Sequence, residues 1–254
     1  MATTKHSPEQ EEATQGGALL QPIQRRSFLR YAGFSACATG LLLAGCGDDD
    51  DDDVQNAVDV GSGDNGVLNY AYALEQLEAA FYAQIKTGTY YTGLAASSAE
   101  RMILDDLAIH EKAHADFFKT ALGSAAIKQL EPDFSSVNFN DRSSVLNAAK
   151  AFEDLGVAAY NGAGRFIQTP AYLVLAGKIV SVEARHAALI RDLLAYNSFV
   201  DNDVVDLFSP TSATSGPGVG NGTGLERSKR PAEVLTTANQ FLKPGSKVSA
   251  NSLR

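Results

Sequence analysis

Apolar residues recur every three or four positions along four segments of the chain, which is the pattern of helices that bury one face. The second segment has Ser97 as its expected N-terminal cap with Glu100 three residues later, and the fourth begins at Pro170, a favourable first-turn residue. No strand-like alternation of useful length lies between them. The predicted helices cover residues 68–86, 97–122, 144–167 and 170–196.

The connection between the second and third helices, residues 123–143, is long and contains Pro132 with several Ser and Asn. Four helices with one long connection in the middle form an all-α four-helix bundle with a single crossover. Residues 209–224 are rich in Gly, Ser, Thr and Pro and predict a loop, whereas 231–242 predict one short helix packed on the outside. We therefore expect one bundle domain at residues 66–197 and a loop-rich C-terminal tail at 198–254.

The N-terminal residues, 1–45, have the features of an export signal. Arg25 and Arg26 are followed by an apolar run at residues 31–43 that is too short to span a bilayer. This order of features resembles a twin-arginine export signal, and the sequence Leu-Ala-Gly-Cys ending at Cys46 resembles a bacterial lipobox, in which the cysteine becomes a lipidated N-terminus. The alternative is a buried helix with an incidental cysteine.

Six consecutive aspartates, residues 48–53, follow Cys46. Because like charges repel, we expect residues 46–65 to form a solvated tether that holds the domain off the membrane. Acidic stretches at this place also resemble the surface-export signals of some Gram-negative lipoproteins. We expect an exported protein anchored in the membrane through lipidated Cys46, and both the periplasm and the cell surface remain open as locations.

Charge and cysteine usage exclude several functions for this chain of 254 residues. A formal net charge of −9 argues against a nucleic-acid partner, since phosphate binding needs clustered Lys and Arg. The chain has only two cysteines, too few for a disulfide framework or a cysteine-rich zinc site. Cys37 would be removed with the signal and Cys46 would carry lipid, so no thiol would remain for catalysis.

Glutamate and histidine occupy positions that should face the core. The second and fourth predicted helices each contain Glu-x-x-His, and the neighbours of these motifs on the same face are apolar. The first and third helices each contain Glu-x6-Tyr, so the chain repeats one unit. Buried carboxylates are costly unless they are paired or bind metal. The set of four glutamates and two histidines from four helices is that of dinuclear carboxylate bundles, and it predicts the ligands Glu75, Glu111, His114, Glu153, Glu183 and His186.

These ligand types suit two divalent metal ions, with iron favoured and manganese as the alternative. The competing interpretation is two surface Glu-x-x-His faces with coincidental acids. Tyr82 and Tyr160, which end the two Glu-x6-Tyr units, are either core residues or redox-active side chains near the metal.

The motifs resemble those of the ferritin-like superfamily. The sequence E-Q-L-E-A-A-F-Y from Glu75, with the later E-K-A-H and E-A-R-H, is similar to rubrerythrin-type and ferritin-type metal sites. Together with R-P-A-E-V-L near the C-terminus, it resembles exported ferritin-like proteins related to plant desiccation-associated proteins. The resemblance covers residues 66–197 and, loosely, 230–235. It implies a ferritin-like four-helix bundle and the same six ligands.

Two positions depart from that pattern. The repeat equivalent of Glu78 is Gly156. Glu78 is either an extra ligand, as in rubrerythrin-like sites with a surplus carboxylate, or a solvated helix residue. Some bundle enzymes place an Asp directly before the Glu of Glu-x-x-His, but this chain has His110 and Val182 there. We expect His110 to be an ordinary helix residue, which leaves the outer partners of the metal-binding histidines unassigned.

Two functions remain open at this point. The first is a dinuclear redox site that oxidises Fe(II) or reduces peroxide or oxygen. The second is a non-catalytic bundle that protects the cell envelope during drying or oxidative stress, with a structural or vestigial metal. A hollow iron-storage shell fits poorly, because a lipidated N-terminus and a long C-terminal tail would obstruct its symmetric packing. A small homo-oligomer is compatible with both of these features.

Overall fold

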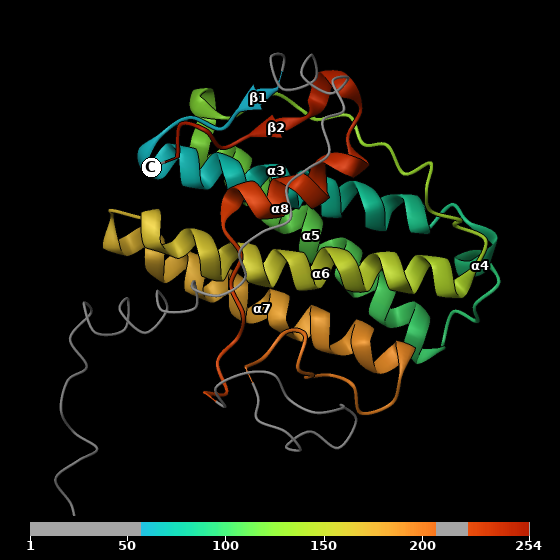
Figure 1. Cartoon of the computed structure of the whole chain (residues 1–254). Coiled ribbons are helices and arrows are strands. Elements are labelled where there is room, and N and C mark those ends of the chain that lie inside the picture. The colour runs from blue at the N-terminus through green and yellow to red at the C-terminus, as the bar shows by residue number, and fades with distance from the viewer. Residues whose placement is uncertain (1–56, 207–222, 254) are drawn as a thin grey trace, which may run out of the picture. The chain divides into compact units, whose positions relative to one another are not determined.

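The computed structural model describes residues 57–206 and 223–253 (Figure 1). The predictions for Arg25, Arg26, Cys46 and the aspartate run therefore lie outside the described residues. The described part is mostly helical, which confirms the predicted all-α class. Its helices are α3 (Gly63–Ile85), α4 (Thr89–Thr92), α5 (Ala99–Leu122), α6 (Arg142–Ala163), α7 (Pro170–Leu194) and α8 (Pro231–Ala238).

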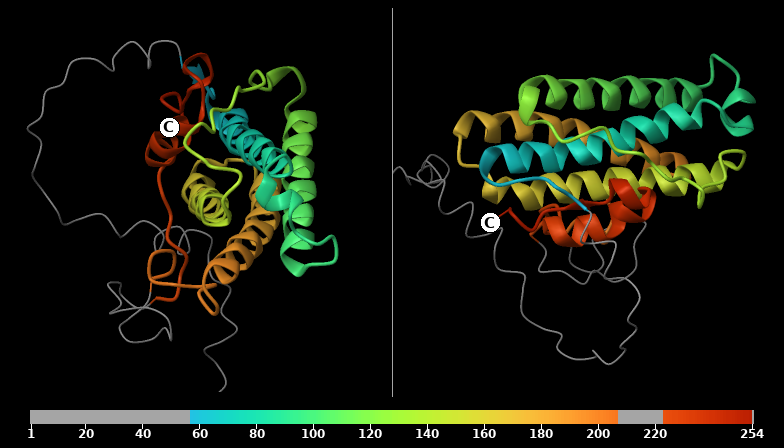
Figure 2. Two further views of the ribbon diagram at one scale, coloured as in Figure 1. Left: turned by 90° about the vertical axis from the view of Figure 1, so that its right-hand side faces the viewer. Right: turned by 90° about the horizontal axis from the view of Figure 1, so that it is seen from above.

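Four long helices form the bundle. Helix α3 packs along α5, and α6 packs along α7, while α3 also contacts α6 and α5 contacts α7 (Figure 1, Figure 2). The segment between α5 and α6 starts with the short 3-10 helix η1 (Gly123–Ala125) and then crosses from one end of the bundle to the other. The predicted four-helix bundle with a long crossover between its second and third helices is thus confirmed.

The helix boundaries follow from local polar contacts. The predicted cap Ser97 was wrong: Ser98 caps α5, because its side chain accepts a hydrogen bond from the backbone N–H of Arg101. Helix α6 is capped by Asp141, which accepts from the N–H of Ser144 at 2.7 Å. Helix α3 begins at Gly63, earlier than predicted. The apolar pattern could not reveal this first turn, because its sequence Gly-Asp-Asn-Gly contains no apolar residue with a large side chain.

The C-terminal segment returns to the bundle and contributes to its core. Helix α8 contacts α3 and α6, and its side chains of Val234 and Leu235 are 0% and 4% exposed. Two 3-10 helices, η3 (Asn239–Phe241) and η4 (Pro244–Ser246), lead to strand β2 (Val248–Ser249), which pairs in parallel with β1 (Val58–Asp59). The predicted short helix is present, but its apolar face belongs to the core.

Within residues 57–206 and 223–253, none of the helices combines the length and the apolar character that crossing a membrane requires. The four long helices instead bury a polar cluster at the centre of the bundle, to which each of them contributes.

Candidate metal centre

Each long helix carries at least one acidic side chain into the interior. Helix α3 contributes Glu75, α5 contributes Glu111, α6 contributes Glu153 and α7 contributes Glu183, and all four residues are 0% exposed. The apolar side chains one turn away on the same faces are buried with them, so packing of the helix faces carries the glutamates inward.

The structure brings the six residues expected from the sequence into two clusters that could hold metal ions, with ligand atoms within 4.8 Å of one another in each. We call them the His114 subsite and the His186 subsite after the histidine that each contains. The His114 subsite consists of Glu75, Glu111, His114 and Glu183. The His186 subsite consists of Glu111, Glu153, Glu183 and His186. Glu111 and Glu183 therefore belong to both.

The two shared glutamates divide their oxygens between the subsites. Atom Nδ1 of His114 lies 2.8 Å from Oε1 of Glu183 and 3.4 Å from Oε2 of Glu111. Atom Nδ1 of His186 lies 2.7 Å from Oε1 of Glu111 and 3.5 Å from Oε2 of Glu183. Ligand atoms about 2.1 Å from one ion are about 3 Å apart, so these separations match the edges of a coordination shell. Glu111 and Glu183 would thus each be able to offer one oxygen to either subsite.

The two unshared glutamates are each held by a tyrosine from a different helix. Tyr160 of α6 donates a hydrogen bond to Oε1 of Glu75, and Tyr82 of α3 donates to Oε1 of Glu153 at 2.5 Å. The second oxygen of each glutamate faces a histidine: Oε2 of Glu75 is 3.4 Å from Nδ1 of His114. The tyrosines thus fix one oxygen of each carboxylate and leave the other oxygen for the cluster.

Several buried atoms that face the cluster have no hydrogen-bond partner. They are Oε2 of Glu75, Oε1 of Glu111, Oε2 of Glu153, both oxygens of Glu183 and Nδ1 of His186. Atoms Nδ1 of His186 and Oε1 of Glu111 approach within 2.7 Å, yet their orientation makes no hydrogen bond. An unpaired buried polar group costs about 1–3 kcal/mol. Metal coordination would satisfy these lone pairs together, so the donor set fits divalent ions.

The protonation states of the metal-free cluster follow from burial and from its mixed charges. Burial raises the pKa of Glu153 to about 8 and that of Glu75 well above its ordinary value. Burial also opposes ionisation of Glu111, but the two neighbouring histidines lower its pKa to about 2. Burial disfavours protonated His114 and His186, yet the surrounding carboxylates raise the pKa of each to about 12. Protons therefore occupy the cluster where metal would bind.

Glu78 is a further buried acid beside the cluster, with 3% exposure. Burial and repulsion from the four ligand glutamates raise its pKa well above the ordinary value. Its Oε1 lies 3.0 Å from the place where a Cβ on Gly156 would stand. Glu78 is thus not a solvated helix residue. Its side chain fills the space that a side chain at Gly156, its repeat equivalent, would occupy. It belongs to neither of the two clusters.

Sequence reasoning missed the contact that His110 makes. Atom Nδ1 of His110 lies 2.9 Å from Nε2 of His186, on the side of the His186 ring away from the glutamates. The two rings are stacked, with centroids 5.1 Å apart and an interplanar angle of 15°. The available signal was its position directly before Glu-x-x-His, where some bundle enzymes place an Asp.

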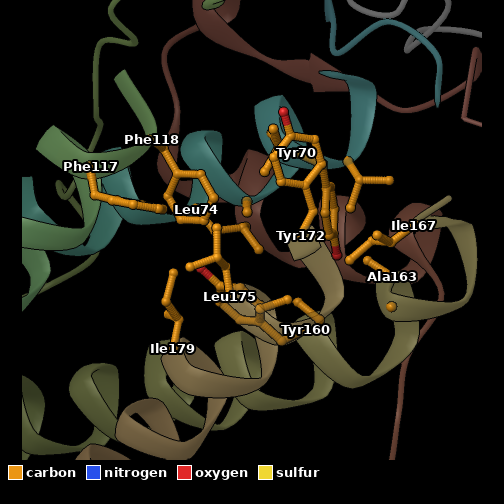
Figure 3. Close-up of a pocket in the computed structure, with 16 residues that line it drawn as sticks. Tyr70, Leu74, Phe117, Phe118, Tyr160, Ala163, Ile167, Tyr172, Leu175 and Ile179 are labelled. Atoms are coloured by element: carbon orange, nitrogen blue, oxygen red, sulfur yellow. The ribbon is translucent and has the colours of Figure 1, made fainter. Parts of the chain in front are cut away.

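An apolar cavity of about 30 Å³ lies one helical turn beyond the His114 subsite. Its wall includes Leu74, which precedes Glu75, and Phe118 and Ile179, which lie one turn from His114 and Glu183 respectively. Tyr160, the partner of Glu75, also lines it, and these side chains, which come from α3, α5, α6 and α7, point toward one another in Figure 3. The cavity thus adjoins the unshared end of that subsite.

Comparison with known protein families supports the same assignment of fold. A family model described as a ferritin-like domain matches residues 63–196, slightly more than half of the chain. This match runs from the first residue of α3 to just beyond the end of α7. A search of curated proteins gave no significant match.

The pKa values predict that metal binding releases protons. At pH 7 the metal-free His114 and His186 are protonated and so is Glu153, whereas metal ligation requires their deprotonated forms. Affinity for Mn(II) should therefore rise from pH 6 to pH 8, because proton competition falls. Calorimetry in buffers of different ionisation enthalpy measures the released protons. Heat that is independent of the buffer would contradict this, and Glu131→Gln, at an exposed acid, is the control.

Proposed function

The chain belongs to the ferritin-like domain family, and from this membership we propose that it is an oxidoreductase with a dinuclear metal site that oxidises Fe(II) with dioxygen or peroxide. The observation that carries the proposal is the pair of subsites that share Glu111 and Glu183. Glu111 and Glu183 would hold two ions close enough to act on one small molecule. When bound, iron supplies the electrons, and the protein supplies the geometry.

The donor set supports iron, or manganese, as the metal. Four carboxylates and two imidazoles are hard or borderline donors, which suit these ions better than soft metals. Four glutamates carry as much negative charge as two divalent ions carry positive charge. Because the site is buried, this neutralisation supports occupancy by two ions rather than one.

Two Fe(II) ions would supply two electrons, which with two protons reduce one dioxygen to hydrogen peroxide, or one hydrogen peroxide to two waters. Burial and repulsion from the four ligand glutamates raise the pKa of Glu78, so this side chain would supply one of the two protons. Solvent would supply the other. Tyr82 and Tyr160 hold their glutamates in place throughout, through hydroxyl hydrogen bonds.

The apolar cavity supports an oxygen reaction over a purely structural metal. Its volume of about 30 Å³ accommodates a diatomic molecule, and its lining side chains are almost all apolar. Dioxygen partitions into such a space, whereas charged or sugar-like substrates do not. The cavity adjoins Glu75 through Tyr160, so a molecule held there is one helical turn from the His114 subsite.

We further propose that the protein is exported and anchored to the membrane by lipid on Cys46. The order of Arg25 and Arg26, a short apolar run and Leu-Ala-Gly-Cys supports this. The aspartate run after Cys46 supports a tether that holds the domain away from the lipid surface, in the periplasm or outside the cell. The twin-arginine route suits proteins that fold with their cofactor before export, and this fits a protein that binds its metal in the cytoplasm.

The iron site is tested by anaerobic titration of metal-free protein with Fe(II), followed by dioxygen. We expect two ions per chain and then the near-ultraviolet absorbance of Fe(III). Glu111→Gln and Glu183→Gln should lose both ions, because each removes a shared ligand, whereas Glu75→Gln and Glu153→Gln should each lose one. Glu131→Gln, at a carboxylate 70% exposed, should behave as wild type. Absence of uptake, or uptake unchanged in all four variants, would favour the non-catalytic envelope function.

The cavity is tested by filling it from α7. Ala176→Leu places three extra carbons in the cavity, so iron oxidation by dioxygen should slow several-fold while the iron stoichiometry stays unchanged. Xenon should bind the wild-type cavity in pressurised crystals and should be absent from the variant. The control is Ala121→Leu at an exposed position of α5. Equal oxidation rates for the two variants would exclude the cavity as the dioxygen site.

Lipid anchoring is tested by changing the two cysteines separately in a Gram-negative host. Wild-type protein should incorporate labelled palmitate and sediment with membranes. Cys46→Ser should lose the label and become soluble, whereas Cys37→Ser, in the part that is cleaved, should behave as wild type. Replacement of both Arg25 and Arg26 by Lys should block export. Palmitate labelling that survives in Cys46→Ser would refute the anchor.

A further inference from the structure

We propose that His110 positions His186 and thereby makes the two metal subsites unequal: the His186 subsite retains its ion, and the His114 subsite exchanges its ion with the surrounding solution. This inference rests on the dinuclear site proposed above. It names the subsite through which the second ion enters and leaves, which the ligand set alone does not determine.

The contact between His110 and His186 joins two helices. His110 lies on α5 directly before Glu111, and His186 lies on α7 three residues after Glu183. Their nitrogens are 2.9 Å apart and their rings are stacked, so the His186 ring is restrained in both tilt and rotation. Its Nδ1 is thereby kept on the carboxylate side, 2.7 Å from Oε1 of Glu111.

The hydrogen bond also assigns the tautomer of a metal-binding His186. An imidazole that ligates through Nδ1 carries its remaining proton on Nε2. That proton faces His110, so His186 Nε2–H donates to the lone pair on Nδ1 of His110, and His110 carries its own proton on Nε2. Such an outer acceptor increases the basicity of a ligand imidazole and fixes its orientation.

The repeat equivalent of His110 provides no such group for the other subsite. Val182 precedes Glu183 as His110 precedes Glu111, and its side chain neither donates nor accepts a hydrogen bond. The side chain of His114 is also more exposed than that of His186, at 15% against 3%. All four residues of the His186 subsite are buried, whereas His114 is only partly buried. Water therefore reaches the His114 subsite more readily.

These differences set an order of binding. Loss of an outer hydrogen bond to a metal ligand typically weakens metal affinity about 10- to 100-fold. The His186 subsite should therefore fill first and release its ion last. The His114 subsite, beside solvent and beside the apolar cavity, is then the position where an incoming Fe(II) is taken up.

The experiment is titration of the metal-free full chain with Co(II) alone, a redox-stable probe whose visible absorbance reports each site. Wild type should show two separated steps. His110→Ala should weaken the tighter step about 10- to 100-fold and leave the weaker step unchanged. His110→Asn, whose side-chain amide lies where Nδ1 of the imidazole lay, should recover most of the loss. Val182→Ala is the matched control and should alter neither step.

A second readout separates positioning from general stability. In the Co(II)-loaded protein the shifted N–H proton of His186 should exchange slowly with water in wild type and in His110→Asn, and rapidly in His110→Ala. Equal wild-type steps, or equal weakening of both steps in His110→Ala, would overturn the assignment while leaving the dinuclear site intact. Absence of Co(II) uptake at either step would instead refute the metal site itself, and the inference with it.

Discussion

The burial of four glutamate carboxylates at the centre of the bundle is the constraint on which the rest of the structure depends. A carboxylate removed from water must be neutralised, paired or coordinated. In the metal-free chain, burial raises the pKa of Glu75 and of Glu153, which favours their neutral forms, and two imidazolium groups lie beside Glu111. Metal ions would take the place of those protons.

Reciprocal tyrosine contacts tie the first and third long helices together beside the cluster. Tyr82 of α3 binds the glutamate of α6, and Tyr160 of α6 binds the glutamate of α3, so the two helices are tied at both ends of the cluster. Each hydroxyl is itself buried and therefore needs this acceptor. Each contact therefore satisfies both a buried hydroxyl and a buried carboxylate. Because both contacts join α3 to α6, they also restrict how far apart Glu75 and Glu153 lie.

Much of the fold and of the cluster could be predicted because both follow from spacing along single helices. Residues such as Glu111 and His114 share a face at any helix orientation. Contacts between helices depend on axial rotation and stagger, which spacing does not encode, so the contact between His110 of α5 and His186 of α7 was missed. The pairing of Val58 with Val248 joins distant segments only two residues long, too short for any alternating pattern.

The repeat in the sequence makes the departures from symmetry informative. The two halves of the bundle are equivalent at six ligands and two tyrosines, and they differ at two buried or cluster-contacting positions that belong to neither cluster. At one, Glu78 fills the space beside Gly156; at the other, His110 contacts His186 where Val182 offers no polar group. Both polar members lie in the first half of the chain. A symmetric site would treat two bound ions alike, whereas these two side chains would distinguish the proposed ions by proton supply and by ligand orientation. Asymmetry of this kind suits a site in which one ion stays and the other is consumed.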